Sequence, residues 1–211
     1  MFHFQDILVL APHTDDGELG CGASLARHIA AGSRVTYVAF STCAQSLPGG
    51  LPPDTLEHEC RAATKALGIQ EVIFLDFAVR HMPEHRQEIL EELVKLNRRL
   101  KPGTVYLPAR NDVHQDHQLI HSEGMRAFRN CNLLGYELPW NNTRFEPNYF
   151  EQLTEQHLQA KQSALREYRS QAHRNYMSDE FIRSLAIVRG IQSGSGLAEA
   201  FEAYKLIGFQ V

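Results

Sequence analysis

The sequence predicts an α/β fold built on a mostly parallel sheet, and two patterns carry this prediction. Short apolar, β-branched runs alternate along the chain with longer segments whose apolar residues recur at helical spacing. Turn residues separate the two kinds of segment, for example Gly32 and the pair Pro102-Gly103. At 211 residues, the chain is long enough to bury a substantial core, and we expect a single domain over residues 1–211.

The expected elements follow one another in chain order. The strand-like runs cover residues 7–11, 35–40, 72–75, 104–107 and 133–138. The helical segments cover residues 19–31, 55–67, 84–100, 155–168 and 179–188. The stretch 41–53 after the second strand is rich in Ser, Pro and Gly, so it predicts a loop long enough to form one wall of a site.

Composition excludes several classes of function. The chain has 21 Lys and Arg against 25 Asp and Glu, a net charge of -4, and no basic run, which argues against nucleic acid as a partner. No apolar run approaches the roughly 20 residues that span a bilayer, so no transmembrane segment is expected. The cysteines are scattered, without a C-x-x-C pair, and predict reduced thiols in a cytoplasmic protein. They are Cys21, Cys43, Cys60 and Cys131.

Two polar clusters follow strand-like runs about a hundred residues apart. The first is His13-Thr14-Asp15-Asp16, after the run 7–11, and the second is His114-Gln115-Asp116-His117, after the run 104–107. The carboxyl ends of parallel strands meet at one edge of a sheet, where such folds bind ligands. Two His and one Asp are enough to bind zinc and leave a position open for water. The two clusters therefore predict a hydrolytic metal site.

Spacing suggests different tasks within the first cluster. In His13-x-x-Asp16 the imidazole and the carboxylate can converge on one ion, while Asp15 points elsewhere and is free to act as a general base. The alternative is that Asp15 or Asp16 only caps the following helix, since Asp is a preferred N-cap residue.

In the second cluster, His114 and His117 share a face if a helix begins there. Asp116 lies off the centre of that face and can orient an imidazole from the side, as carboxylates near metal-bound histidines commonly do. The alternative is an ordinary polar loop. His121, one turn further on, could approach the site, but we interpret it as a solvated helix residue.

Other candidates are weaker. The order of Gly17, Gly20 and Gly22 does not fit the dinucleotide fingerprint G-x-G-x-x-G, and no nucleophile elbow follows a strand. Several late polar residues are interpreted as helix-surface or packing residues: Tyr168, Ser170, Gln171, Tyr176 and Tyr204. Lys161 and Glu199 are ambiguous in the same way.

Four segments, in order, resemble the PIG-L/LmbE-like zinc-dependent N-deacetylases. Residues 11–22 resemble the A-H-P-D-D-E-x-x-x-G-x-G signature, and residues 111–117 resemble D-x-H-x-D-H. Residues 161–171 are similar to K-x-x-A-L-x-x-Y-x-S-Q, and residues 198–202 to A-E-A-F-E. The resemblance implies a Rossmann-like three-layer α/β/α sandwich without a bound dinucleotide. It also implies homo-oligomers as an alternative to a monomer.

The resemblance also assigns roles to the two clusters. It implies that His13, Asp16 and His117 ligate Zn²⁺, or another divalent transition metal, that Asp15 is the general base and that His114 stabilises the oxyanion. We further expect the neighbouring charge of Asp116 to raise the pKa of His114 and favour its charged form.

The implied function is removal of an N-acetyl group from a GlcNAc-like sugar, releasing acetate and a free amine, in glycan, glycolipid or sugar-thiol biosynthesis. The alternatives are deacylation of a non-sugar amide and a non-catalytic carbohydrate-binding protein, although the latter would need neither metal nor base. The sequence departs from the family at Thr14, where Pro is usual, and at Gly17-Glu18, where the family has an acidic residue directly after the Asp pair. The basic residue that the family has before Glu59 is not evident near Leu56, and Val79-Arg80-His81 stands where an acidic residue is usual. The metal chemistry is therefore better supported than the sugar specificity.

Overall fold

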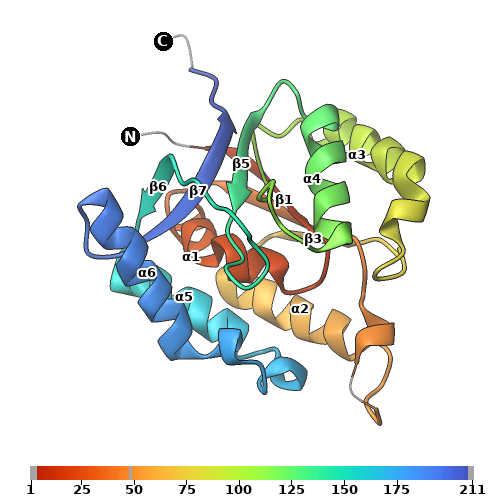
Figure 1. The fold of residues 1–211 in the computed structure, drawn as a ribbon, viewed down its shortest axis with the longest axis horizontal. Helices are drawn as coiled ribbons and strands as arrows, with labels where there is room; N and C mark the ends of the chain where they lie inside the picture. The colour runs from red at the N-terminus through yellow and green to blue at the C-terminus, as the bar shows by residue number, and fades with distance from the viewer. Residues whose placement is uncertain (1–3, 48, 209–211) are drawn as a thin grey trace.

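A seven-stranded sheet with helices on both faces forms the fold (Figure 1). The computed structural model describes residues 4–47 and 49–208. The strands are β1 Asp6–Ala11, β2 Arg34–Ala39, β3 Glu71–Phe74, β4 Thr104–Pro108, β5 Asn132–Tyr136, β6 Tyr149–Gln152 and β7 Ala198–Lys205. The helices are α1 Asp16–Ala30, α2 Thr55–Leu67, α3 Arg86–Leu100, α4 Gln115–Ala127, α5 Glu155–Leu165 and α6 Asp179–Ser193. Short 3₁₀ turns lie at Ala44–Ser46, Met82–His85, Arg169–Gln171 and Asn175–Met177.

The strand order β3-β2-β1-β4-β5-β7-β6 explains where a site forms. β1 pairs in parallel with both β2 and β4, and the chain builds the sheet outward from β1 in opposite directions. The carboxyl ends of β1 and β4 therefore flank a topological switch point, where open α/β sheets have a crevice. Both polar clusters follow these two strands.

The central strand is buried on both faces, as parallel strands between helical layers are. Ile7, Val9 and Ala11 belong to the core beneath α1, α2, α5 and α6, whereas Leu8 and Leu10 belong to the core beneath α3 and α4. Figure 1 shows these two helical layers on opposite sides of the sheet. The predicted three-layer α/β sandwich with a mostly parallel sheet is confirmed.

Two strands were missing from the sequence prediction. β7 runs antiparallel to β5, and β6 runs antiparallel to β7 at the sheet edge. β7 reads Ala-Glu-Ala-Phe-Glu-Ala-Tyr-Lys, in which Ala, Glu and Lys are poor strand formers. Tertiary pairing, not local preference, makes this segment a strand.

Helix boundaries also differ at functionally relevant positions. α1 begins at Asp16 and not at residue 19, so the last residue of the first cluster lies in the first helical turn. α5 ends at Leu165, which leaves Tyr168 in the connection that follows. No helix in the described part of the chain is long and apolar enough to cross a membrane.

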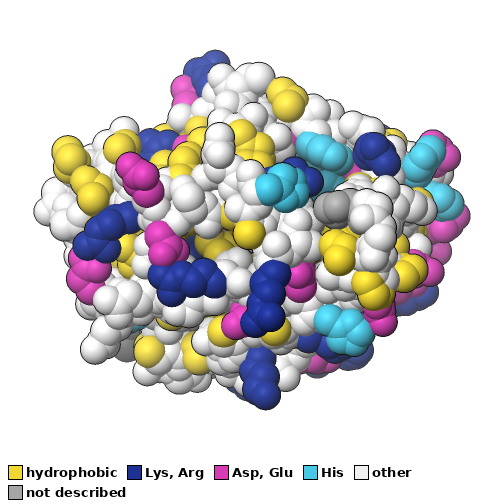
Figure 2. Space-filling view, turned by 90° about the horizontal axis from the view of Figure 1, so that it is seen from below, with side chains coloured by type: hydrophobic (Ala, Val, Ile, Leu, Met, Phe, Trp, Pro, Cys, Tyr) yellow, Lys and Arg dark blue, Asp and Glu magenta, His cyan; other side chains and the backbone are white. Residues whose placement is uncertain are grey.

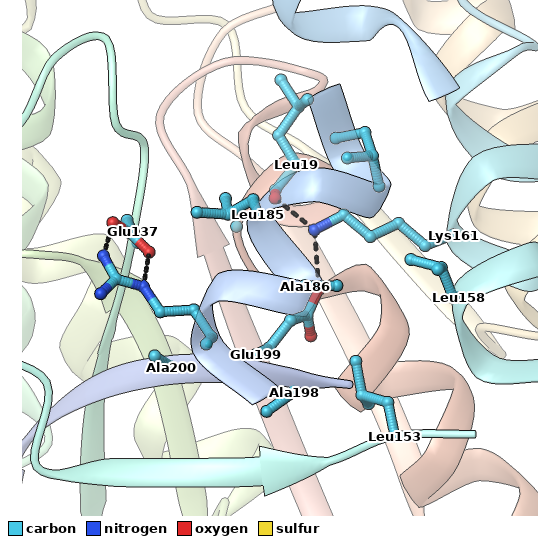
Figure 3. Close-up of a pocket in the computed structure, with 13 residues that line it drawn as sticks. Leu19, Glu137, Leu153, Leu158, Lys161, Leu185, Ala186, Ala198, Glu199 and Ala200 are labelled. Carbon is cyan, nitrogen blue, oxygen red and sulfur yellow. Dashed lines mark hydrogen bonds and ion pairs between the residues drawn. The ribbon is translucent and has the colours of Figure 1, made fainter. Parts of the chain in front are cut away.

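A buried ion pair ties α1 to α5 and β7 (Figure 3). Lys161 Nζ donates to Glu199 Oε1 at 2.7 Å and to the Leu19 carbonyl at 2.6 Å, and Glu199 accepts from the backbone N–H groups of Ala23 and Ser24. In a regular α-helix a carbonyl accepts from the N–H group four residues later, as the Leu19 carbonyl would from Ala23. Lys161 and Glu199 therefore bind backbone groups inside α1 itself. Lys161 and Glu199 are thus structural residues, which resolves their ambiguity. The hollow beside them holds only about 20 Å³, the space of a single water molecule.

Candidate active site

The two polar clusters meet between β1 and β4. His13 lies in the connection from β1 to α1, Asp16 opens α1, and His117 lies in the first turn of α4. His13 Nδ1 is 3.2 Å from Asp16 Oδ2 and 3.1 Å from His117 Nε2, and His117 Nε2 is 3.2 Å from Asp16 Oδ2. Tetrahedral zinc with ligand bonds near 2.0–2.1 Å separates its donor atoms by about 3.3 Å. The triangle of donor atoms has the size that such an ion requires.

In His13 and His117, the ring nitrogen that points away from the triangle is hydrogen-bonded, and this bond determines whether the other nitrogen carries a proton. His13 donates from Nε2 to Asp116 Oδ2 at 3.0 Å, and His117 donates from Nδ1 to Asp112 Oδ2 at 2.7 Å. A neutral imidazole with its proton at the outer nitrogen presents a lone pair at the inner one. Two lone pairs and a carboxylate oxygen then converge with no proton between them, an arrangement that a cation stabilises.

Protons occupy these positions when no cation does. Burial lowers the pKa of His13, but the charge of Asp16 and the hydrogen bond to Asp116 outweigh it and raise the pKa to about 9. His117 behaves in the same way, with Asp16 and Asp112 raising its pKa to about 10. For Asp16, burial raises the pKa, but the charges of His117 and His13 dominate and hold it well below its usual range. The chemistry of this N, N, O donor set fits zinc or a similar divalent transition metal.

Asp15 lies at the cavity wall beside the triangle. Its carboxylate makes no hydrogen bond or ion pair with another side chain among the described residues, and it does not cap α1 although it occupies the N-cap position. Burial, followed by the charge of Asp16, raises the pKa of Asp15 to about 6. The geometry therefore argues against the simple capping interpretation and leaves a free carboxylate next to the donor atoms.

His114 forms the third imidazole of the cluster. The ligand atoms of His13, His114 and His117 all lie within 4.8 Å of one another, so three histidines are an alternative donor set. His114 is the N-cap of α4, and its Nδ1 accepts the Asp116 backbone N–H at 3.2 Å. In the neutral ring this places the proton at Nε2, which can donate to another group.

Asp116 raises the pKa of His114, as expected, but its charge is not enough to favour the charged form of the ring. Asp116 Oδ2 lies 3.9 Å from His114 Nδ1, but only 3.0 Å from His13 Nε2. The pKa of His114 is lowered, first by burial and then by the charges of His13 and His117, which outweigh the opposing charge of Asp116. Asp116 therefore orients an imidazole, as predicted, but that of His13 from the other cluster.

Sequence reasoning missed the orienting role of Asp112. Besides its contact with His117, this carboxylate accepts the His114 backbone N–H at 2.8 Å, so it fixes both histidines of the second cluster. Asp112 and Asp116 are both buried, and Asp116 Oδ1 has no hydrogen-bond partner within the described residues. The signal was present in the D-x-H-x-D-H segment, but the spacing does not show which carboxylate pairs with which histidine.

A cavity of about 250 Å³ opens above the donor atoms. Besides the two clusters, its wall contains Leu19 of α1 and Leu56 of α2. The other lining residues come from four connecting segments: Cys43, Ser46, Val79, Arg80, Trp140, Asn141, Gln171, Arg174 and Tyr176. Trp140 and Tyr176 stack with ring centroids 4.0 Å apart. Figure 2, seen from below Figure 1, shows histidine side chains directly beside Lys or Arg side chains on one face. The predicted loop wall is confirmed through Cys43 and Ser46, while Pro48 lies outside the described residues.

Comparison with known proteins agrees with this geometry. Residues 8–128 match the family described as PIG-L, GlcNAc-PI de-N-acetylase. The chain belongs to the PIG-L family. It is 32% identical over 172 residues to the uncharacterized deacetylase YaiS of Escherichia coli, covering 79% of this chain and 91% of that protein.

More distant relatives extend the PIG-L match. The diacetylchitobiose deacetylase of Thermococcus kodakarensis is 25% identical over 220 residues, covering 92% of this chain and 81% of that protein. Among solved structures, the conserved protein TT1542 from Thermus thermophilus has a TM-score of 0.81 and 25% identity, covering 98% of this chain and 97% of that one. The resemblance seen in the sequence is confirmed, and so is the fold that it implied.

The hydroxyl groups of Tyr37 and Tyr168 contact the connection between β1 and α1, which carries His13. The Tyr37 hydroxyl lies 2.9 Å from the Thr14 carbonyl and 2.5 Å from Glu18 Oε2, and the Tyr168 hydroxyl lies 2.6 Å from Thr14 and 3.1 Å from Glu18 Oε1. Two hydroxyl protons serve only two of these four contacts, and a protonated Glu18 serves a third. Burial raises the pKa of Glu18 to about 8, although the hydrogen bonds from Tyr37 and Tyr168 oppose the rise. Tyr168 is buried, and it contacts the loop that carries His13.

His121 and Tyr204 lie away from the donor atoms of this PIG-L site. His121 is buried, contacts the Pro108 carbonyl through Nδ1 at 2.9 Å and packs edge-on against Tyr204. The interpretation of His121 as a solvated helix residue is therefore wrong, because Pro108 of β4 and Tyr204 of β7 cover it. Gln171 and Tyr176 are not merely packing residues, since both line the cavity.

Proposed function

We propose that this protein is a zinc-dependent hydrolase that removes the N-acetyl group from a GlcNAc-like sugar in glycan, glycolipid or sugar-thiol biosynthesis. The observation that carries the proposal is the triangle formed by His13, Asp16 and His117 beside the unpaired carboxylate of Asp15. Membership of the PIG-L family and the sugar substrate in the name of the Thermococcus relative support the same activity. Four free, buried cysteines support the expected cytoplasmic location. Analytical ultracentrifugation distinguishes the homo-oligomer from the monomer, the two alternatives that the sequence left open.

His13, Asp16 and His117 would hold the ion. A divalent ion there supplies Lewis acidity, which activates water and polarises an amide carbonyl. Asp15 accepts a proton from the attacking water, since its carboxylate is free at the cavity wall. His114 donates from Nε2 to the carbonyl oxygen as negative charge develops there, because its Nδ1 is already an acceptor.

The reaction balances with one water and no other reactant. Water adds a C–O bond to the acetyl carbon, the C–N bond breaks, and the proton held by Asp15 passes to the departing nitrogen. The second proton of the water stays on the new carboxyl group and is released when the acid ionises, so the products are acetate, a free amine and this proton. A neutral His114 fits this role because its lowered pKa keeps the ring uncharged near neutral pH, and a donor N–H needs no charge.

Acetate release over a panel of substrates tests the proposal. The panel contains methyl N-acetylglucosaminide and N,N'-diacetylchitobiose, with N-acetylated amino acids representing non-sugar amides. We expect acetate and a new primary amine from the sugars only. Release from the amino acids alone would establish the non-sugar alternative, and binding of sugars without acetate would establish the carbohydrate-binding alternative.

Metal analysis of variants tests the ligand set. Asp16→Ala and His117→Ala should lose most of the bound zinc, and His114→Ala should retain about one ion per chain, as expected for three protein ligands and an open position. Loss of zinc in His114→Ala with retention in Asp16→Ala would instead establish the three-histidine donor set.

A further inference from the structure

Arg80 has a backbone held by hydrogen bonds and a guanidinium group without a partner among the described residues. It lines the cavity and is exposed, and its guanidinium has no hydrogen bond, ion pair or ring contact within the described chain. Its backbone is held on both sides: the N–H donates to Asp116 Oδ2 at 2.7 Å, and the carbonyl accepts from Gln115 Nε2 at 3.2 Å. Since Asp116 Oδ2 also contacts His13, the position of Arg80 is tied to the donor atoms.

The backbone conformation of Arg80 is one that favours glycine. Its φ is 71°, and the described residues contain only two other non-glycine residues with positive φ, Cys43 and Lys101. Strained backbone at non-glycine residues clusters at binding and active sites. Arg80 and Cys43 both line this cavity, whereas Lys101 ends α3. The positive φ of Arg80 at the cavity wall is thus a second observation, besides its free guanidinium, that points to a role in the site.

Arg174, the other arginine of the cavity, is already engaged. It donates from Nε to Gln171 Oε1 at 2.7 Å and from Nη1 to the Tyr176 hydroxyl at 2.6 Å. Arg80 is therefore the cationic group of the cavity wall with all its donors available. A planar guanidinium with free donors matches the geometry of phosphate and carboxylate groups.

The charges around the cavity do not exclude an anion. Asp112 and Asp116 are buried behind the histidines that they contact, and Asp15 and Asp16 lie at the donor atoms. A divalent ion together with Arg80 and Arg174 equals the charge of these four carboxylates. Arg80 is then an exposed positive group of the cavity wall that an anion can contact.

We propose that Arg80 forms an anion subsite, which binds a phosphate or carboxylate on the group attached to the N-acetylated sugar. The inference rests on the proposed function and narrows its substrate class to sugars with an anionic substituent. The acetyl group then lies beside the donor atoms of His13, Asp16 and His117, while the anion contacts Arg80 in the connection after β3. The two ends of the substrate are thus bound by different parts of the fold.

Three matched substrates test this proposal: N-acetylglucosamine 1-phosphate, the N-acetylglucosaminide of glycolic acid, and the uncharged methyl N-acetylglucosaminide. We expect higher kcat/KM for one or both anionic substrates than for the methyl glycoside, and the two anionic arms identify whether phosphate or carboxylate is preferred. In Arg80→Ala the anionic-to-neutral ratio should fall about 10-fold or more, the range for a lost charge-assisted hydrogen bond. Arg80→Lys should retain part of the preference.

The control is Arg98→Ala, which removes an exposed arginine of α3 that has no partner among the described residues and lies away from the cavity. Arg98→Ala should leave the anionic-to-neutral ratio of kcat/KM unchanged. A fall of similar size in this variant would show that the preference comes from the overall charge of the protein and not from Arg80. Equal kcat/KM for all three substrates in the wild type would overturn the subsite. No acetate from any of them would instead overturn the proposed deacetylase function.

Binding and stability provide readouts that do not depend on turnover. Glucosamine 1-phosphate should raise the Tm of the wild type more than methyl glucosaminide does, and this difference should disappear in Arg80→Ala. Arg80→Gly should also lose the difference, but without a lower Tm, since glycine accepts the positive φ. A large drop in the Tm of Arg80→Gly with the binding difference retained would show that Arg80 serves folding and not recognition.

Discussion

At the scale of single residues, the partner of each histidine determines which nitrogen faces the site. Asp116 and Asp112 hold the outer nitrogens of His13 and His117, so the inner nitrogens present lone pairs toward Asp16. The strand signals led to both clusters and their histidines, and the family resemblance supplied the three candidate ligands. The sequence could not identify the pairs, since Asp116 reaches His13 only because β1 and β4 are neighbours in the sheet.

The first prediction concerns Asp15. Asp15→Asn retains the shape of the side chain but cannot accept a proton, so turnover should fall by about 100-fold or more. Zinc content should not change, because the three proposed ligands remain. Steady-state acetate release and elemental analysis on the same preparation provide both measurements. A nearly normal rate of acetate release would show that another group, and not Asp15, is the general base.

The second prediction concerns Glu18 and pH. The folded pKa, about 8, lies above the ordinary value of 4.5, so the folded protein retains a proton that the unfolded chain releases between these values. The free energy of unfolding should therefore fall as pH rises through this window, by up to roughly 1.4 kcal/mol per pH unit from this group. Glu18→Gln removes that dependence.

Urea unfolding with saturating zinc measures the effect of Glu18. The stability of Glu18→Gln relative to the wild type should increase between pH 4.5 and about pH 8 and become constant above that. Glu180→Gln, on the exposed surface of α6, is the control and should show no such trend. A constant difference across the window would mean that Glu18 is ionised in the folded protein.

At the scale of elements, the sequence predicts best where local pattern and tertiary structure agree. α2 has the predicted bounds, Thr55–Leu67, because its apolar positions recur at helical spacing and Gly68 adopts a positive φ at its end. β6 and β7 were missed because their pairing partners, not their composition, make them strands. Arg174 and Trp140 were missed for a related reason, since they lie in connections without a periodic signal.

The third prediction concerns the connection after α5. Tyr168→Phe removes the hydroxyl 2.6 Å from the Thr14 carbonyl, which supports the loop between His13 and Asp15. We expect a stability loss of about 1 kcal/mol. We also expect kcat to fall by roughly 10-fold with little change in KM, since small displacements of catalytic groups are costly.

Tyr149→Phe is the matched control for Tyr168→Phe. It removes a hydroxyl that contacts Glu151 on β6, away from the donor atoms. It should lower stability by a similar amount and leave kcat unchanged. An equal loss of kcat in both variants would mean that Tyr168 acts only through stability.

At the scale of the whole molecule, strand order concentrates the chemistry. The sheet grows in both directions from β1, so the loops after β1 and β4 diverge around a crevice, and residues a hundred positions apart form one donor triangle. In the absence of a cation, this arrangement buries charged groups: His117 and Asp16 are both buried, and each has a strongly shifted pKa. These shifts favour the charged forms, so the groups stabilise one another when no ion is bound. An ion that replaces their protons in the folded protein adds a further stability that depends on its concentration.

The last prediction follows from that dependence. An ion that binds only the folded protein stabilises it by about 4 kcal/mol at a thousand times its Kd. For a chain of this size, that corresponds to a change in Tm of roughly 8–16 °C. Removing zinc with a chelator should lower Tm by an amount in this range, and adding zinc back should restore it. His117→Ala should show a much smaller response, because one of its three donors is missing. An equal response in His117→Ala would place the stabilising ion outside the triangle of His13, Asp16 and His117.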